Sequence, residues 1–210
     1  MFGVIRNIGV ILVATVFVLS TFFFGIGPAY AAADFDTITV NLSVNATISI
    51  ACTDTVNMGG ITGTGQSALG TNSATCTIIT NNSGGYSLVW QASAATMTDA
   101  TADTIAAYTP AAPNTPEVWS VAGADSEWGA HLGSTSTTVN AITWGALDTY
   151  AGGKWLNVNN AATFEIANRG TETAAGGDSE LVWFGAEVGA GHFQPTGTYT
   201  VNVTMTATTN

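Results

Sequence analysis

Apolar and polar residues alternate along the stretch from Ile38 to Cys52. Every even position is apolar, and every odd position holds Thr, Asn, Ser or Ala. Successive side chains of a β-strand point to opposite faces, so the even residues share one apolar face; on a helix they would scatter around the axis. The pattern predicts one long strand, the most regular segment of the first half of the chain.

Two shorter alternating segments follow, at Asn72–Thr80 and Tyr86–Trp90. They flank Asn81–Gly85, whose Asn, Ser and Gly residues are typical of a tight turn. Residues 72–92 are therefore predicted to form a β-hairpin. The intervening residues 53–71, rich in Gly, Thr and Ser, are predicted to be mainly a loop.

Regular patterns return in the last quarter of the chain. Residues 163–167 predict a short strand, and Glu180–Val188 predicts a strand with apolar side chains on both faces, which is typical of a central or doubly covered strand. Residues 199–207 alternate again and predict the last strand.

Residues 93–160 are less regular. They contain three prolines, many alanines and short pieces bearing four of the six tryptophans: Trp119, Trp128, Trp144 and Trp155. We predict a mostly irregular insertion with short strands that packs over one edge or end of the sheets. Seven or more strands separated by turns, without helices, indicate an all-β fold, an immunoglobulin-like two-sheet antiparallel β-sandwich.

The first 33 residues have the pattern of a secretory signal. One basic residue, Arg6, precedes an apolar run, and small residues at 29–33 fit a cleavage site. An uncleaved anchor is the alternative, because the apolar run is long enough to cross a bilayer. We expect a single exported domain, residues 34–210, that is extracellular or on the cell surface and has no membrane segment after cleavage.

Charge narrows the list of partners. Removal of residues 1–33 leaves Lys154 and Arg169 against fourteen acidic residues, so the formal charge changes from −11 to −12. Phosphates and anionic lipid surfaces would be repelled, which argues against nucleic acid and membrane partners.

Cys52 and Cys76 are the whole cysteine content of the chain. An even number in an exported protein favours a disulfide, and both residues lie in segments predicted to be strands. Two buried free thiols are the alternative.

Candidate catalytic and metal-binding residues are sparse. Close acidic pairs occur at Asp99/Asp103, Asp125/Glu127 and Asp178/Glu180. They could bind calcium or serve a glycosidase, although solvated loop acids explain them equally well. His131 and His192 show no metal-ligand spacing. We expect no enzymatic activity and no cofactor.

The tryptophans allow two interpretations. Exposed rings of Trp119, Trp128, Trp144 and Trp155 would stack on sugars and make the protein a carbohydrate-binding module. Packing in the core of the insertion is the favoured alternative, because large apolar surfaces are normally buried.

The chain resembles secreted bacterial domains of the spore coat protein U and fimbrial-subunit type. The resemblance rests on the alternating strand ending in Cys52, Cys76 in a second strand, Gly-Tyr-Ser-Leu at 85–88, and a final Pro-x-Gly-x-Tyr motif from Pro195. It covers residues 36–92 and 180–210. It implies that a cysteine pair joins the first two strands and that an N-terminal segment of one subunit completes the sheet of the next.

In such an assembly the apolar side chains Ile38, Val40, Leu42 and Val44 would be donated to a neighbour. The alternative is that this strand pairs within its own subunit. We therefore expect a non-enzymatic structural protein of the bacterial surface, a pilus, fibre or coat subunit, whose partners are its own copies or other surface subunits. The second hypothesis is a module that binds a glycan or a host ligand.

Overall fold

The computed structural model describes residues 34–133, 141–145 and 152–210, and the expected signal segment lies outside these ranges. The chain divides into two units, Met1–Ser43 and Val44–Asn210. The described part of the first unit, residues 34–43, is called the tail below, and the second unit is called the body. Within the described residues, no helix is long and apolar enough to cross a membrane.

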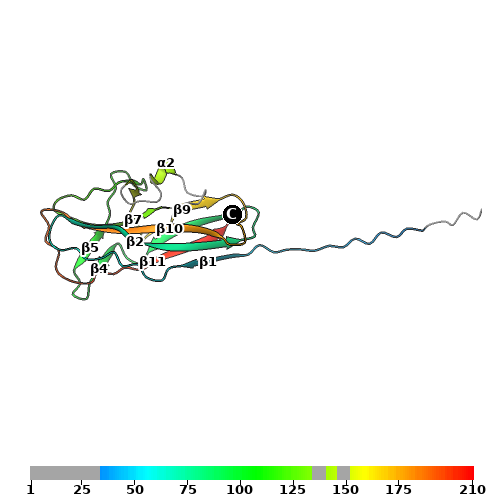
Figure 1. Cartoon of the computed structure of the whole chain (residues 1–210), viewed down its shortest axis with the longest axis horizontal. Helices are drawn as coiled ribbons and strands as arrows, with labels where there is room; N and C mark the ends of the chain where they lie inside the picture. The colour runs from blue at the N-terminus through cyan, green and yellow to red at the C-terminus, as the bar shows by residue number, and fades with distance from the viewer. Residues whose placement is uncertain (1–33, 134–140, 146–151) are drawn as a thin grey trace, which may run out of the picture. The chain divides into compact units, whose positions relative to one another are not determined.

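The described part of the body is all-β apart from one four-residue helix, α2 (Ala141–Trp144). Its described strands are β1 (Ile48–Cys52), β2 (Gln66–Thr80), β3 (Tyr86–Ala92), β4 (Thr96–Thr98), β5 (Thr104–Ala107), β6 (Glu117–Val118), β7 (Ser126–Leu132), β8 (Lys154–Trp155), β9 (Phe164–Arg169), β10 (Asp178–Val188) and β11 (Val203–Thr209). Figure 1 shows the long strands of the body running alongside one another.

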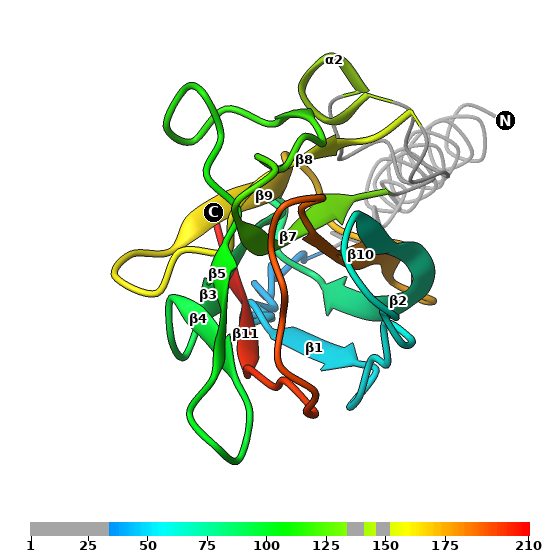
Figure 2. The ribbon, with the colours of Figure 1, turned by 90° about the vertical axis from the view of Figure 1, so that its left-hand side faces the viewer.

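These strands form three sheets. The largest has the order β1-β2-β10-β7-β5-β4, the second has the order β11-β3-β9, and β6 pairs with β8. Pairing is antiparallel except between β5 and β7. Figure 2, which looks along the strands, shows the six-stranded sheet curling from β1 round to β5 and β4. The core combines buried side chains of both larger sheets.

The prediction of a central strand near the C-terminus is confirmed. β10 lies between β2 and β7 and pairs antiparallel with both. Strands β9 and β11 also form where the sequence predicts them, although β11 begins four residues later than the alternation does.

The predicted hairpin over residues 72–92 is wrong. β2 belongs to the six-stranded sheet, whereas β3 pairs with β11 and β9 in the three-stranded sheet. The turn at Asn81–Gly85 forms, with positive φ at Gly85, but it carries the chain across the core from one sheet to the other. The residues of a turn determine that the chain reverses direction, but they do not determine which strand the next segment pairs with.

Residues 93–160 also require a correction, because they are not an irregular insertion laid over an edge. β7 forms part of the interior of the six-stranded sheet, and all seven of its residues are buried. Trp128, Ala130 and Leu132 alternate with Glu127, Gly129 and His131, and the residues on both faces of the strand are buried.

The first strand is shorter than predicted. Only Ile48–Cys52 form β1, and residues 34–47 are in no strand. Among the described residues, no strand pairs with the alternating segment from residue 38 to residue 46.

A disulfide joins Cys52 at the end of β1 to Cys76 in β2. The two residues are direct partners in the β1–β2 ladder, so their side chains lie on the same face. Closing a loop with a sequence separation of 24 stabilises the fold by about 3 kcal/mol in the chain-entropy model.

Candidate functional site

Two strand edges without a partner lie close to each other in the body. β1 is the last strand on one side of the six-stranded sheet, and β11 is the last strand of the three-stranded sheet. The two strands approach each other but belong to different sheets, so no ladder of hydrogen bonds joins them. Each edge therefore presents free backbone N–H and C=O groups, to which a further strand can bind.

A pocket of about 210 Å³ opens beside this pair of edges. One side is formed by the chain that continues from β1, and the other by β11 with the residues before it; strands β2, β4, β7 and β10 supply the rest. The lining residues are Cys52, Thr53, Asp54, Val56, Met58, Ala74, Met97, Trp128, Val182, Phe184, Val201, Asn202, Val203 and Met205. We call this pocket, with the two edges that flank it, the groove.

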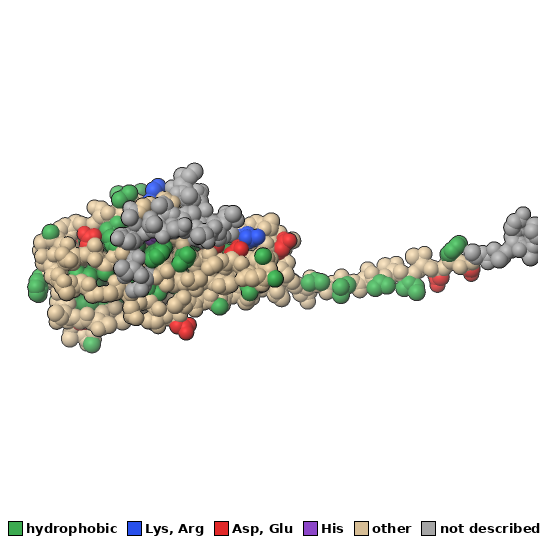
Figure 3. All heavy atoms as spheres, in the orientation of Figure 1, with side chains coloured by type: hydrophobic (Ala, Val, Ile, Leu, Met, Phe, Trp, Pro, Cys, Tyr) green, Lys and Arg blue, Asp and Glu red, His purple; other side chains and the backbone are tan. Residues whose placement is uncertain are grey.

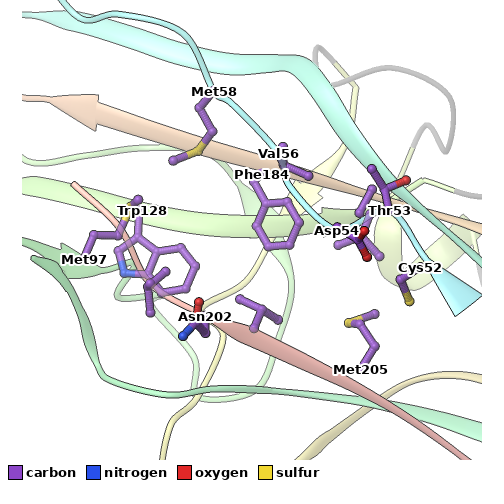
Figure 4. Close-up of a pocket in the computed structure, with 14 residues that line it drawn as sticks. Cys52, Thr53, Asp54, Val56, Met58, Met97, Trp128, Phe184, Asn202 and Met205 are labelled. Carbon is purple, nitrogen blue, oxygen red and sulfur yellow. The ribbon is translucent and has the colours of Figure 1, made fainter. Parts of the chain in front are cut away.

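Most side chains of the groove are apolar. Figure 4 shows Phe184 in the middle of the close-up, with Trp128 and Met97 toward one end and Cys52 and Met205 toward the other. Asp54 is the one charged residue of the lining. The side chains are mostly apolar, but polar atoms form a comparable share of the exposed lining, so the cleft suits an uncharged occupant that offers both apolar side chains and hydrogen-bonding groups.

The core is less well covered beside the groove than elsewhere. The partly buried apolar residues that pack against it are Ile48, Ile50, Cys52, Met58, Ile61, Phe164, Phe184, Tyr199, Val201, Val203, Met205 and Ala207. All of them except Phe164 and Phe184 come from β1, from the chain after it, or from β11 and its approach. The apolar surface that remains exposed therefore follows the seam between the two unpaired edges.

Methionine is concentrated in the groove. Of the four methionines of the chain, Met58, Met97 and Met205 line it, and the fourth is Met1. Methionine is unbranched and polarizable, and its side chain adapts to neighbours of irregular shape. The walls can therefore close around an inserted apolar segment.

The tail presents its apolar side chains to solvent. Figure 3 shows hydrophobic side chains spaced along it. The exposed fractions are 86% for Phe35, 82% for Ile38, 86% for Val40, 88% for Leu42 and, at the first residue of the body, 76% for Val44. Complete burial of one such side chain contributes about 1.5–3 kcal/mol. A run of exposed apolar side chains is typical of a segment that binds a partner.

Length and charge also match the tail to the groove. The alternating apolar segment from Ile38 to Val44 has seven residues, as many as β11. After Asp36 no charged residue occurs until Asp54. A strand formed by this segment would carry no charge into the apolar groove.

Three of the four tryptophans proposed for ligand stacking are buried. Trp128, Trp144 and Trp155 are 1%, 2% and 0% exposed, so their rings face the core and present no stacking surface. Trp119 is half-buried, stacks on Tyr108 with ring centroids 4.6 Å apart, and donates a hydrogen bond to Glu187. The packing interpretation fits these positions.

The acidic pairs have local partners. Asp99 accepts hydrogen bonds from Thr101 and from the amide of Asp103, and the Thr101 hydroxyl holds the pKa of the Asp99 carboxyl below its usual value. Asp178 forms an ion pair with Arg169 at 2.9 Å.

Asp178 and Glu180 also meet at one hydroxyl. Both carboxylates accept hydrogen bonds from the hydroxyl of Tyr86, each at 3.1 Å. Burial of that hydroxyl, together with the two nearby carboxylates, raises the pKa of Tyr86 far above its ordinary value. The pair thus connects the two larger sheets through the core.

The two histidines lie in different environments. His131 is buried, with Nδ1 3.0 Å from the carbonyl of Lys154, and His192 contacts Gln194. Among the described residues, no group of three or more His, Cys, Asp or Glu side chains is arranged to hold a metal ion.

The groove itself was not predicted from the sequence. Its lining comes from strands separated by up to about 150 residues, and the pairing of those strands decides which side chains meet. The available signal was indirect: the first and last strands alternate between apolar and polar residues, as edge or one-sided strands do.

No family model matches the chain, and no curated protein is significantly similar to it.

Proposed function

We propose that the protein is a non-enzymatic structural subunit of the bacterial cell surface, part of a pilus, fibre or coat, whose copies assemble by β-strand pairing. The tail of one copy enters the groove of the next and pairs with the free edges of β1 and β11. The added strand completes an immunoglobulin-like two-sheet sandwich that a single copy leaves open along one seam.

One observation carries this proposal: an exposed, alternating apolar segment occurs in the same chain as an apolar groove between two unpaired strand edges. In strand addition, main-chain hydrogen bonds supply affinity while alternate side chains fill pockets and supply specificity. The even residues of the tail provide these side chains, and the odd residues, Thr39, Asn41 and Ser43, would face solvent.

The proposed function places the protein outside the cell. The Cys52–Cys76 disulfide is consistent with an oxidising compartment. The signal pattern of residues 1–33 points to the same destination. Carbohydrate binding has less support, since Trp128, Trp144 and Trp155 are buried.

The test uses the chain from Asp34 to Asn210, examined by negative-stain electron microscopy and by gel electrophoresis without boiling. We expect filaments and an SDS-resistant ladder. The double variant Val40→Asp/Leu42→Asp places two charges on the inserted face, and it should remove the ladder while the monomer unfolds at the same urea concentration as the wild type.

A matched control is available in the same segment. Asn41→Asp/Ser43→Asp adds the same two charges to the polar face and should retain the ladder. A ladder that survives Val40→Asp/Leu42→Asp, or one that both double variants abolish equally, would contradict insertion of the even-numbered side chains.

A further inference from the structure

The side chain of Asn81, the first residue after β2, holds the residues that precede β1. Its Oδ1 accepts a hydrogen bond from the backbone amide of Thr47 at 2.7 Å, and its Nδ2 donates one to the carbonyl of Asn45 at 3.0 Å. The hydroxyl of Thr80 donates to the carbonyl of Thr47 at 2.7 Å. These bonds continue the β1–β2 ladder beyond its last backbone pair, Ile48↔Thr80.

The Asn81 amide acts here as a substitute for a peptide group. A primary amide offers the same donor and acceptor as the backbone, so it can extend a strand ladder where the partner strand has ended. We call these contacts of Asn81 and Thr80 with residues 45–47 the strap. The strap lies within the body, directly before the point where β1 begins.

The strap affects whether the tail can occupy the groove of its own copy instead of the groove of another. The tail could fold back and fill the groove of its own copy, by pairing antiparallel with the free edge of β1 as the second strand of a hairpin. To keep its apolar side chains on the inward face, it must place even residues opposite Ile48, Ile50 and Cys52. The shortest loop that does so contains residues 45–47, and the next shortest contains residues 43–47.

Both loops include the three backbone groups that the strap holds: the amide of Thr47 and the carbonyls of Asn45 and Thr47. A three-residue hairpin loop also needs a residue in the left-handed region at its end. Among the described non-glycine residues only Ala102 and Asn114 have positive φ, so residues 45–47 are not in that conformation. Folding back therefore requires this segment to change its backbone conformation and to break the Asn81 hydrogen bonds.

We propose that Asn81 is a positioning residue that keeps the tail out of its own groove and so leaves the groove to another copy. This inference rests on the proposed function. Asn81 touches neither the lining of the groove nor the tail; it acts on the segment that joins the tail to β1.

The test is cleavage of the tail by chymotrypsin in dilute monomer of the chain Asp34–Asn210, at Phe35 and Leu42. The tail contains no lysine or arginine, so trypsin would not report on it. The wild-type tail should be cut rapidly. In Asn81→Ala the ratio of folded-back to open monomer should rise roughly thirtyfold, because the two hydrogen bonds to the backbone of residues 45 and 47 are lost and each contributes about a factor of five. Cleavage should slow accordingly, and the ladder should form more slowly.

Two further variants separate the strap from general stability. Asn82→Ala removes hydrogen bonds to the carbonyls of Gly85 and Asn210 but none to residues 45–47, so tail cleavage should stay as in the wild type. Asn81→Asp retains an acceptor for the Thr47 amide and loses the donor to Asn45, so its cleavage rate should lie between those of wild type and Asn81→Ala.

The outcomes distinguish this inference from the proposed function. Equal cleavage of wild type and Asn81→Ala, or equal protection in Asn82→Ala and Asn81→Ala, overturns the role of Asn81 even when wild-type ladders form. A wild type that never forms ladders, while its tail is readily cut, overturns the assembly proposal. The cleavage comparison is made in monomer and does not depend on assembly.

Discussion

The two halves of the stretch Ile38–Cys52 have the same alternating pattern and different structures. Residues 48–52 form β1, whose even side chains are partly buried against the core and whose last residue is bonded to Cys76. Residues 38–44 are in no strand, and their even side chains are more than three-quarters exposed. An alternating pattern therefore specifies a face for burial, but it does not say that the same chain provides the partner.

The largest effect on stability is expected for residues 48–52, the half of the stretch that the disulfide holds. Replacing both Cys52 and Cys76 by alanine should lower the free energy of unfolding of the body by about 3 kcal/mol, because the unfolded chain loses its cross-link. Urea unfolding followed by tryptophan fluorescence measures this. Cleavage at Leu42 in the monomer should keep its wild-type rate; an altered rate would show that the two halves are structurally coupled.

A pair of truncations compares the halves directly. Ile50→Ala removes a half-buried side chain of β1 and should cost about 1–2 kcal/mol, below the range for fully buried isoleucine. Leu42→Ala removes a side chain that is 88% exposed and should change the stability of the monomer by no more than a few tenths of a kcal/mol. Urea unfolding of both variants below the concentration at which ladders form checks this. A large loss for Leu42→Ala would mean that the tail already packs within one copy.

The smallest effect is expected for a substitution that changes the stability of the body without changing assembly. Glu127 in β7 is 8% exposed, and burial, with Asp125 adding to it, raises the pKa of its carboxyl above the ordinary value. A raised folded pKa means that stability is fully present below the unfolded-state pKa and is lost as the pH rises through the folded pKa. Glu127→Gln should therefore stabilise the body at pH 7 and make little difference near pH 3, where the carboxyl is protonated in both states.

The pH dependence of urea unfolding between pH 3 and pH 7 measures the Glu127 effect. Glu172→Gln is the matched control, because Glu172 is exposed and should show no such trend. The ladder of Glu127→Gln should match that of the wild type. A gain in stability at pH 3 equal to that at pH 7 would refute the electrostatic cause.

The strands that could be predicted are those whose sequence carries a periodic signal. β10, β9 and β11 show apolar runs or alternation, and each forms near its expected position. β7 also alternates, but over only three apolar residues, Trp128, Ala130 and Leu132, and its sequence does not show that the opposite face is covered as well. That burial depends on contacts far away in sequence, such as the two backbone hydrogen bonds between Ala130 and Leu156.

Strand partners were harder to predict than strands. Asn81–Gly85 has the composition of a hairpin turn, and in the structure it connects two different sheets. A hairpin within one sheet would place the inward side chains of β2 and β3 beside each other, whereas a connection between two sheets places them on opposite sides of the core. Both strands present such side chains, for example Ile78 and Leu88, so the local sequence leaves the choice open.

In the proposed assembly, the groove and the tail determine the valence of each copy. If each copy uses this one donor segment and this one acceptor site, it binds two neighbours at most, so strand exchange would produce linear chains or closed rings and no branches. Because the contact is heterologous, a linear chain is also polar: a vacant groove remains at one end and a free tail at the other. A protein that fills only a groove, or supplies only a tail, would therefore terminate growth at one defined end.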